Sequence, residues 1–118
     1  MPDARFPVEI VKGVPVVSTP EEIDVTNANG LRAALLQSAV QGHGRFVVDM
    51  SRTQFCDTAG LHTLVGAHKR ALAEGGEIRL VLSGAAVQRI FVITGLSDVI
   101  PNFTSLQEAL IQTPDRCD

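Results

Sequence analysis

The chain has 118 residues, about the size of one domain, and 45% of them are hydrophobic, whereas only five, all phenylalanine, are aromatic. Ten basic residues lie scattered along the sequence and the net charge is −3, which argues against the basic stripe of a nucleic-acid-binding protein. The sequence has no signal-peptide pattern and no run of 18 apolar residues, so we expect a cytoplasmic protein without a membrane partner.

The first two predicted elements are β-strands. Val8–Val11 and Val14–Val17 are short apolar runs separated by Lys12-Gly13, a pattern typical of two strands joined by a tight turn. Pro15 has no amide hydrogen to donate, so the second strand should either lie at an edge of the sheet or begin late.

Two segments are alternative starts for the first long helix. Thr19-Pro20-Glu21-Glu22 combines a capping threonine, a proline suited to the first turn and a glutamate three residues on. Residues 24–29 are equally rich in capping side chains, and we favour a start near Thr26 because the apolar residues that follow recur with helical spacing. The glycines of Gly42-His43-Gly44 should end this helix.

The middle of the chain predicts a strand, a helix and another strand. Phe46–Val48 is too short for a helix and is typical of a buried strand, which should end at Asp49. Apolar positions from Leu61 to Leu72 follow helical spacing, and Gly75-Gly76 should end that helix. Ile78–Leu82 is the next predicted strand.

The last third predicts two helices and one brief strand. Ala86–Ile93 should form a helix, Val99-Ile100 a short strand, and Ser105-Leu106-Gln107-Glu108 a capping box that opens a helix through Ile111. Strands that alternate with helices indicate a largely parallel sheet with right-handed crossovers. We therefore predict one small α/β domain over residues 1–113, with a mixed sheet of four to five strands and about four helices, followed by a flexible tail over residues 114–118.

A small polar cluster, Asp57-Thr58-Ala59-Gly60, follows the Phe46–Asp49 strand and its loop. Asp57 or Thr58 is a good helix N-cap, and capping alone is one sufficient interpretation. Gly60 favours a second interpretation, because glycine within a helix costs about 1 kcal/mol relative to alanine and leaves the first turn nearly bare. A bare turn would expose the Thr58 hydroxyl to another protein, and a phosphate there would meet free amides at the positive end of the helix dipole.

The cysteines and histidines give little support to catalysis or metal binding. Cytosolic thiols are usually reduced, so we do not expect a disulfide between Cys56 and Cys117. The three histidines and two cysteines lack the spacing of a zinc site, so we expect no metal and no cofactor. A thiol nucleophile formed by Cys56 and His62 lacks an orienting third group, and we expect a protein that is not an enzyme, with Cys56 as a small buried hydrophobe.

The segment FVVDMSRTQFCDTAGLHTLVGAHKRA resembles the central signature of the STAS-domain anti-sigma factor antagonists. That signature is an apolar strand, Asp-(Leu/Met)-Ser, a short loop with phenylalanine, and then Asp-(Ser/Thr)-x-Gly-Leu. The early segment Glu22-Ile23-Asp24 and the later segment GGEIRLVLSGAAVQRIFVITGL are also similar to the family, so the likeness covers nearly the whole chain.

The resemblance implies a regulatory binding module. Members of the family bind an anti-sigma factor that is also a serine/threonine kinase, and this releases a sigma factor. The kinase phosphorylates the residue after the motif's aspartate, here Thr58, the complex separates, and a phosphatase resets the switch. The usual acceptor is serine, and Glu21 replaces the family's early glycine, so this chain departs from the pattern at two positions.

The residues expected to meet the partner surround Thr58 in the predicted structure. The early aspartate of the family corresponds to Asp24, and residues at i+4, i+8 and i+11 from Thr58 share its helical face. The predicted partner-binding residues are Asp24, Asn27, Asp57, Ala59, Gly60, His62, Gly66 and Lys69. We expect a monomer or weak dimer. The alternative function is a STAS subunit of a larger stress-signalling scaffold, in which Thr58 would control the activity of the assembly.

Overall fold

The computed structural model describes residues 5–111 and contains two β-sheets. The main sheet has the strand order β1-β2-β4-β6-β7, in which β1 pairs antiparallel with β2 and all other neighbours are parallel. Its strands are β1 (Val8–Val11), β2 (Val14–Ser18), β4 (Arg45–Asp49), β6 (Glu77–Val81) and β7 (Asn102–Phe103). The second sheet consists only of β3 (Glu22–Ile23) and β5 (Phe55–Cys56), which are parallel. The predicted fold class is confirmed.

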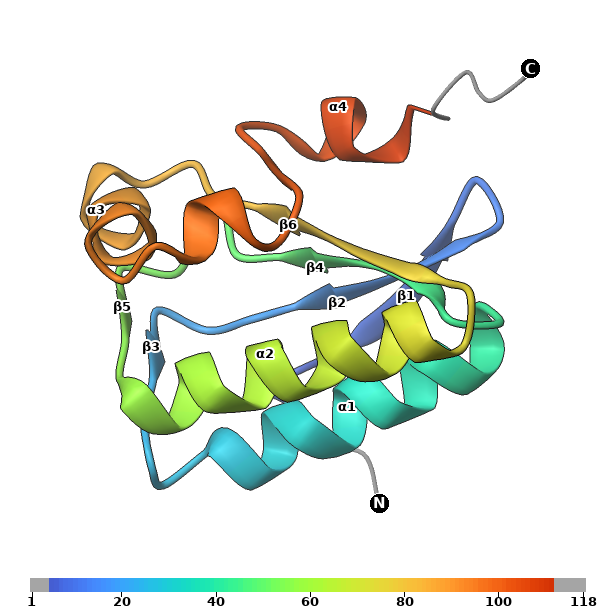
Figure 1. Cartoon of the computed structure of the whole chain (residues 1–118), viewed down its shortest axis with the longest axis horizontal. Helices are drawn as coiled ribbons and strands as arrows, with labels where there is room; N and C mark the ends of the chain where they lie inside the picture. Colours follow the sequence, from blue (N-terminus) through green and yellow to red (C-terminus); the bar gives the residue numbers. More distant parts are fainter. Residues whose placement is uncertain (1–4, 112–118) are drawn as a thin grey trace.

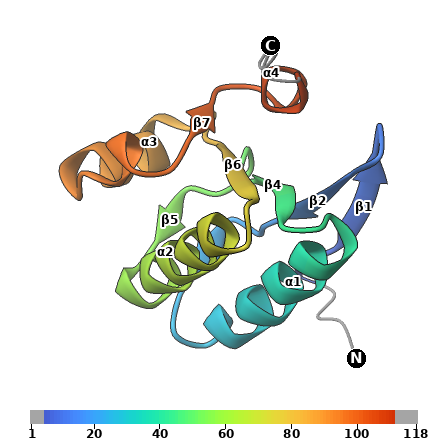
Figure 2. The same cartoon turned by 45° about the vertical axis from the view of Figure 1, so that its right-hand side comes forward.

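The helices cover the main sheet unequally. Helices α1 (Ala28–Gln41) and α2 (Thr58–Ala73) lie side by side on one face, and the short helix α4 (Leu106–Leu110) lies on the other (Figures 1 and 2). Helix α3 (Ala85–Ile93) and the 3₁₀-helix η1 (Leu96–Asp98) lie at one end, where α3 contacts β5 (Figure 1). The two faces of the sheet therefore support helical layers of very different size.

Alternating side chains of the strands fill two cores. Val48 of β4 and Leu80 of β6 point into the larger core, beneath α1 and α2, whereas Val47 and Val81 point into the smaller core beneath α4. All four are almost fully buried, and each buried side chain of this size contributes roughly 1.5–3 kcal/mol. The near-continuous apolar strands are thus explained by burial on both faces.

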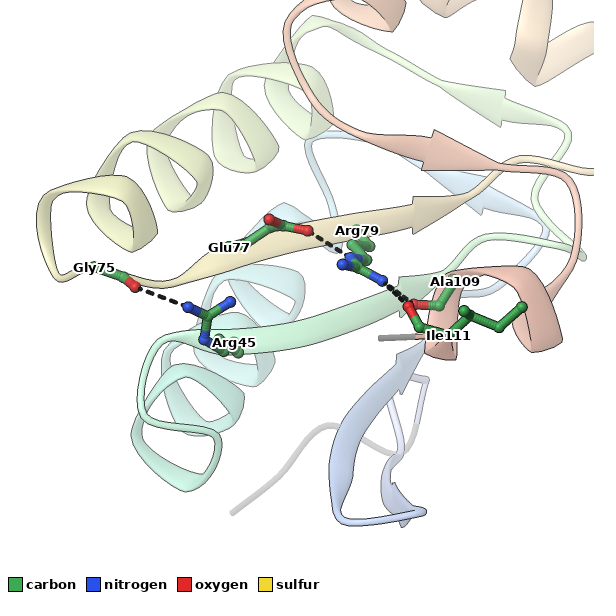
Figure 3. Close-up of polar contacts among 6 residues, drawn as sticks. All are labelled: Arg45, Gly75, Glu77, Arg79, Ala109 and Ile111. Atoms are coloured by element: carbon green, nitrogen blue, oxygen red, sulfur yellow. Dashed lines mark hydrogen bonds and ion pairs between the residues drawn. The ribbon is translucent and has the colours of Figure 1, made fainter. Parts of the chain in front are cut away.

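Arg79 of β6 holds α4 against the smaller face (Figure 3). Its Nη1 atom donates to the carbonyl oxygens of Ala109, at 3.0 Å, and Ile111, at 2.6 Å, and so satisfies carbonyl groups at the end of the helix. Its guanidinium group also forms an ion pair with Glu77 and lies 5.6 Å from the ring centroid of Phe103. This contact anchors the C-terminal part of the described chain.

Most predicted elements are confirmed, with small shifts at their ends. Helix α1 begins at Ala28, close to the favoured start at Thr26, and residues 19–22 do not form a helix. Helix α4 begins after Ser105, whose Oγ atom accepts from the amide of Glu108 as the capping box requires, and it ends at Leu110. The predicted flexible tail, residues 114–118, lies outside the described residues.

The strand predictions differ from the structure in part. Of the two alternatives for Pro15, the edge strand is wrong, because β2 lies between β1 and β4, and the late start describes the pairing with β4, which begins at Val16. The segment Val99-Ile100 is not a strand, because both amides donate to the carbonyl of Leu96 after the 3₁₀-turn, and β7 follows Pro101. The sequence reasoning missed β3 and β5 entirely.

Candidate functional site

The small second sheet brings two distant loops together. Ile23 of β3 pairs with Cys56 of β5, and the amide of Asp57 donates to the carbonyl of Ile23 at 3.0 Å. Asp24 follows Ile23 just as Asp57 follows Cys56, so both aspartates leave this sheet at the same end. The segments that begin α1 and α2 are therefore neighbours, as the resemblance to the family implies for Asp24 and the acceptor loop.

Asp57 caps helix α2 and leaves Thr58 exposed. The backbone of Asp57 is extended, its Oδ1 atom accepts from the amide of Gly60 at 3.2 Å, and its carbonyl accepts from Leu61 at 3.0 Å. Thr58 is the first residue of α2, and within residues 5–111 its hydroxyl makes no hydrogen bond. The capping interpretation is confirmed for Asp57, and it leaves the adjacent hydroxyl available to another molecule.

The loop before α1 is held by its own polar side chains. Asp24 accepts hydrogen bonds from the hydroxyl and the amide of Thr26, and these bonds lower the pKa of the Asp24 carboxyl group. This stabilisation is present at neutral pH and is lost as the pH falls below the ordinary range of an aspartate. Asn27 is buried, accepts from the amide of Asp24 at 2.9 Å and donates to the carbonyl of Glu22 at 2.9 Å. Asn27 therefore fixes the loop that presents Asp24, and its side chain is not on the surface.

Gly60 is explained by internal packing and not by access to solvent. A Cβ atom at this position would lie 2.6 Å from Sγ of Cys56 and 2.7 Å from Cγ2 of Ile23, both of which are buried. The first turn of α2 is thus bare on its inner side because β3 and β5 pack against it. Ala59, next to Thr58, is partly exposed and lies beside the hydroxyl along the chain.

Cys56 is a core residue. It is 2% exposed, and burial together with the charge of Asp57 raises the pKa of its thiol to about 12. The thiol is therefore protonated at neutral pH, which argues against its use as a nucleophile. Cys117 lies outside the described residues, and within those residues no cluster of three or more potential metal ligands occurs.

The remaining predicted contact residues extend along α2. His62 and Lys69 are exposed, and His62 and Gly66 line a groove of about 440 Å³ between α1 and α2. Lys69 lies 11 residues from Thr58, which at the rise of an α-helix corresponds to about 16 Å. These residues therefore extend from the second turn of α2 past the middle of the helix.

Two exposed apolar residues near Thr58 were missed by the sequence reasoning. Val25, two residues after Ile23, is 73% exposed, and Phe55, directly before Cys56, is 48% exposed. The pairing of β3 with β5 places both in the segments that flank the acceptor loop. A lone valine within the polar run Asp24-Val25-Thr26-Asn27 was the signal that could have identified the first of them.

Comparison with known proteins identifies a matching family and several related proteins. Residues 5–109 match the model of the STAS domain family. The anti-sigma-B factor antagonist of Bacillus subtilis is 35% identical over 79 residues, which cover 67% of this chain and 72% of that protein. The crystal structure of an anti-sigma factor antagonist from Mycobacterium paratuberculosis is 31% identical, with a TM-score of 0.80 and coverage of 89% of both chains.

None of the helices in the described part of the chain is both long enough and apolar enough to span a bilayer.

The fold is also similar to that of the antagonist SpoIIAA in its unphosphorylated form, with a TM-score of 0.70, 24% identity and coverage of 89% of this chain and 92% of that one. The family match covers nearly the whole described chain, and the three relatives named above are each described as an anti-sigma factor antagonist. The chain belongs to the STAS-domain anti-sigma factor antagonist family.

Proposed function

We propose that this protein is a phosphorylation-controlled anti-sigma factor antagonist. Unphosphorylated, it binds an anti-sigma factor that has serine/threonine kinase activity, and this releases a sigma factor in the bacterial cytoplasm. Phosphorylation of Thr58 ends the interaction, and a phosphatase acting on phospho-Thr58 restores it. The observation that carries the proposal is the exposed Thr58 hydroxyl, which has no hydrogen-bond partner within residues 5–111, at the first turn of a capped helix.

The position of Thr58 suits a switch that works by charge. A phosphate adds about −1.5 to −2 charges and three acceptor oxygens. Asp57 precedes Thr58, and Asp24 leaves the β3–β5 sheet at the same end, so a docked partner would have to desolvate the phosphate beside two carboxylates. A loss of about 4 kcal/mol in binding free energy corresponds to a thousandfold loss of affinity.

The rest of the domain is suited to act as a rigid support. Asp57 is held by the amide of Gly60, and Gly60 is packed against Cys56 and Ile23. Amides in the first turn of a helix can donate hydrogen bonds to a phosphate without a change of fold. The solved structures of SpoIIAA include an unphosphorylated and a phosphorylated form, which supports a covalent switch in a protein of this fold.

The proposed contact surface consists of exposed and partly exposed residues around Thr58 and along α2. Asp24, Ala59, His62, Gly66 and Lys69 lie on the loop before α1 or along α2, and Val25 and Phe55 add exposed apolar area near the hydroxyl. Apolar residues at the centre of an interface usually contribute most of its binding energy. The buried side chain of Asn27 and the buried Gly60 are assigned to the support of this surface.

The test is phosphorylation of the purified protein by the organism's candidate anti-sigma factor kinases with ATP, followed by mapping of the phosphorylated residue. Phosphate should be found on Thr58, Thr58→Ala should bind the kinase persistently, and Thr58→Glu should bind about a thousandfold more weakly. Ser51→Ala is the matched control, because Ser51 is an exposed hydroxyl residue of the same loop region. Phosphate found only on Ser51, or equal binding by Thr58→Glu and the parent protein, would contradict the proposal.

A further inference from the structure

The layer formed by α1 and α2 has the opposite charge to the chain as a whole. The protein has 13 acidic residues and a net charge of −3, but neither helix sequence contains an aspartate or a glutamate. The charged residues of the two helices are Arg32, Lys69 and Arg70, and α2 also contains the exposed His62 and the buried His68. This face would therefore attract an anionic partner.

The groove in this layer combines an apolar floor with a basic rim. Leu35, Phe46 and Ala71 are buried beneath it, and Arg32 and Arg70 stand on opposite helices at its sides. Along α2 it extends from His62 to Ala71, ten residues that span about 14 Å at the helical rise.

Gly66 lies in the middle of the α2 side of this groove and has no internal reason to be glycine. Leaving aside the backbone of its own helix, a Cβ atom placed there would meet no atom of residues 5–111 within 4 Å, although glycine in a helix interior costs about 1 kcal/mol relative to alanine. Glycine commonly marks a place where another backbone approaches closely. The missing side chain keeps the groove open toward solvent, which points to an external molecule.

The apolar surface continues outside the groove. Leu36 at its rim is 41% exposed, and Val40, one turn further along α1, is 78% exposed. Within the described chain Arg32 forms no hydrogen bond or ion pair, and the ion pair of Arg70 with Glu74, at 3.6 Å between exposed side chains, is weak. Both guanidinium groups are thus available to an anionic ligand.

We propose that the α1–α2 groove binds an acidic amphipathic helix of the anti-sigma factor partner. A row of apolar side chains enters the groove beside Gly66, and carboxylates on the flanks of that helix pair with Arg32 and Arg70. A small molecule that fills 440 Å³ would leave Val40, which lies outside the groove, uncovered, whereas a helix that extends beyond the groove covers it as well. The inference rests on the proposed function only for the identity of the partner.

A second copy of the chain fits this face less well. In a two-fold symmetric dimer each residue of the face meets the same face, so the basic side chains of one copy would oppose those of the other. Like charges across an interface are unfavourable, and neither α1 nor α2 offers a carboxylate to compensate. Charge therefore favours an acidic helix of a different protein.

The first experiment uses two synthetic 18-residue helical peptides, both with leucines at helical spacing, one flanked by glutamates and the other by lysines. Anisotropy titrations should show that the full-length protein binds the glutamate peptide at least about tenfold more tightly. Gly66→Leu, which fills the groove, should remove most of this affinity, and Arg32→Glu with Arg70→Glu should reverse the preference. Ala73→Leu is the control, because Ala73 is exposed on α2 outside the groove.

The second experiment repeats the kinase-binding assay with Gly66→Leu and Thr58→Glu in parallel. Loss of kinase affinity in both variants is the expected result. If Thr58→Glu loses affinity and Gly66→Leu does not, the groove inference is wrong and the proposed function stands; if only Gly66→Leu loses affinity, the phosphorylation switch is wrong. Equal affinity for the two peptides, or a dimer that Gly66→Leu abolishes in sedimentation, would overturn the inference.

Discussion

Helix α2 contains two glycines, six residues apart, that have opposite surroundings. At Gly60 the space for a side chain is occupied by Cys56 and Ile23, whereas at Gly66 that space is empty and opens into the groove beside α1. In the first turn of α2 the protein's own buried side chains therefore require a glycine. In the middle of α2 the glycine leaves a space that is open to another molecule. The comparison shows that a glycine in a helix identifies a contact, but only the structure shows whether the contact is internal.

Gly60→Ala gives the largest expected effect on stability. Its methyl group would lie within 2.7 Å of two buried side chains, so the core must shift, and we expect the free energy of unfolding to fall by about 1–3 kcal/mol. Urea denaturation of the purified proteins measures this change. The double variant Cys56→Ala with Gly60→Ala removes Sγ from the clash and should show a favourable coupling energy between the two sites. A Gly60→Ala protein as stable as the parent would contradict the packing explanation.

Asp57→Ala should have a smaller effect, because it removes one helix cap. The Asp57 carboxylate accepts from the amide of Gly60, and loss of an N-cap costs about 1 kcal/mol. Asp57→Asn keeps the acceptor and should change the free energy of unfolding little, while it removes the negative charge next to Thr58. If Asp57→Asn were as destabilising as Asp57→Ala, the charge and not the cap would hold the first turn.

The sequence predicted those features that depend on local patterns. The hairpin at Lys12-Gly13 and the caps at Asp57 and Ser105 each involve residues close in sequence, and all are confirmed, as is the helical spacing along α2 from Leu61 to His68. The pairing of Ile23 with Cys56 could not be predicted, because β3 and β5 have two residues each and lie far apart in the chain. The packing of Gly60 against these two residues depends on their pairing. From the sequence alone, Gly60 was therefore interpreted as a sign that the first turn of α2 is exposed.

The groove and the C-terminal end of α2 likewise depend on neighbouring elements that the local sequence pattern does not identify. Gly66 was predicted as a contact residue because it shares a helical face with Thr58, but the groove exists only because α1 lies beside α2. Leu72, assigned to the apolar stripe, is 57% exposed, and Ala71 is buried instead. Helical spacing identifies a stripe of residues, whereas the neighbouring elements decide where along the helix that stripe is covered.

Gly66→Ala gives the smallest expected effect, and its sign is opposite to that of Gly60→Ala. The added methyl group meets no atom within 4 Å, and alanine restricts the unfolded chain, so we expect the free energy of unfolding to rise by about 0.4–1 kcal/mol. Urea denaturation under the conditions used for Gly60→Ala measures the change. A decrease in stability would mean that α2 needs glycine at this position for its own conformation, and the open groove would lose its main support as a binding site. An increase in stability accompanied by weaker binding of the glutamate peptide would show that the glycine is kept for an external partner at a cost to the fold.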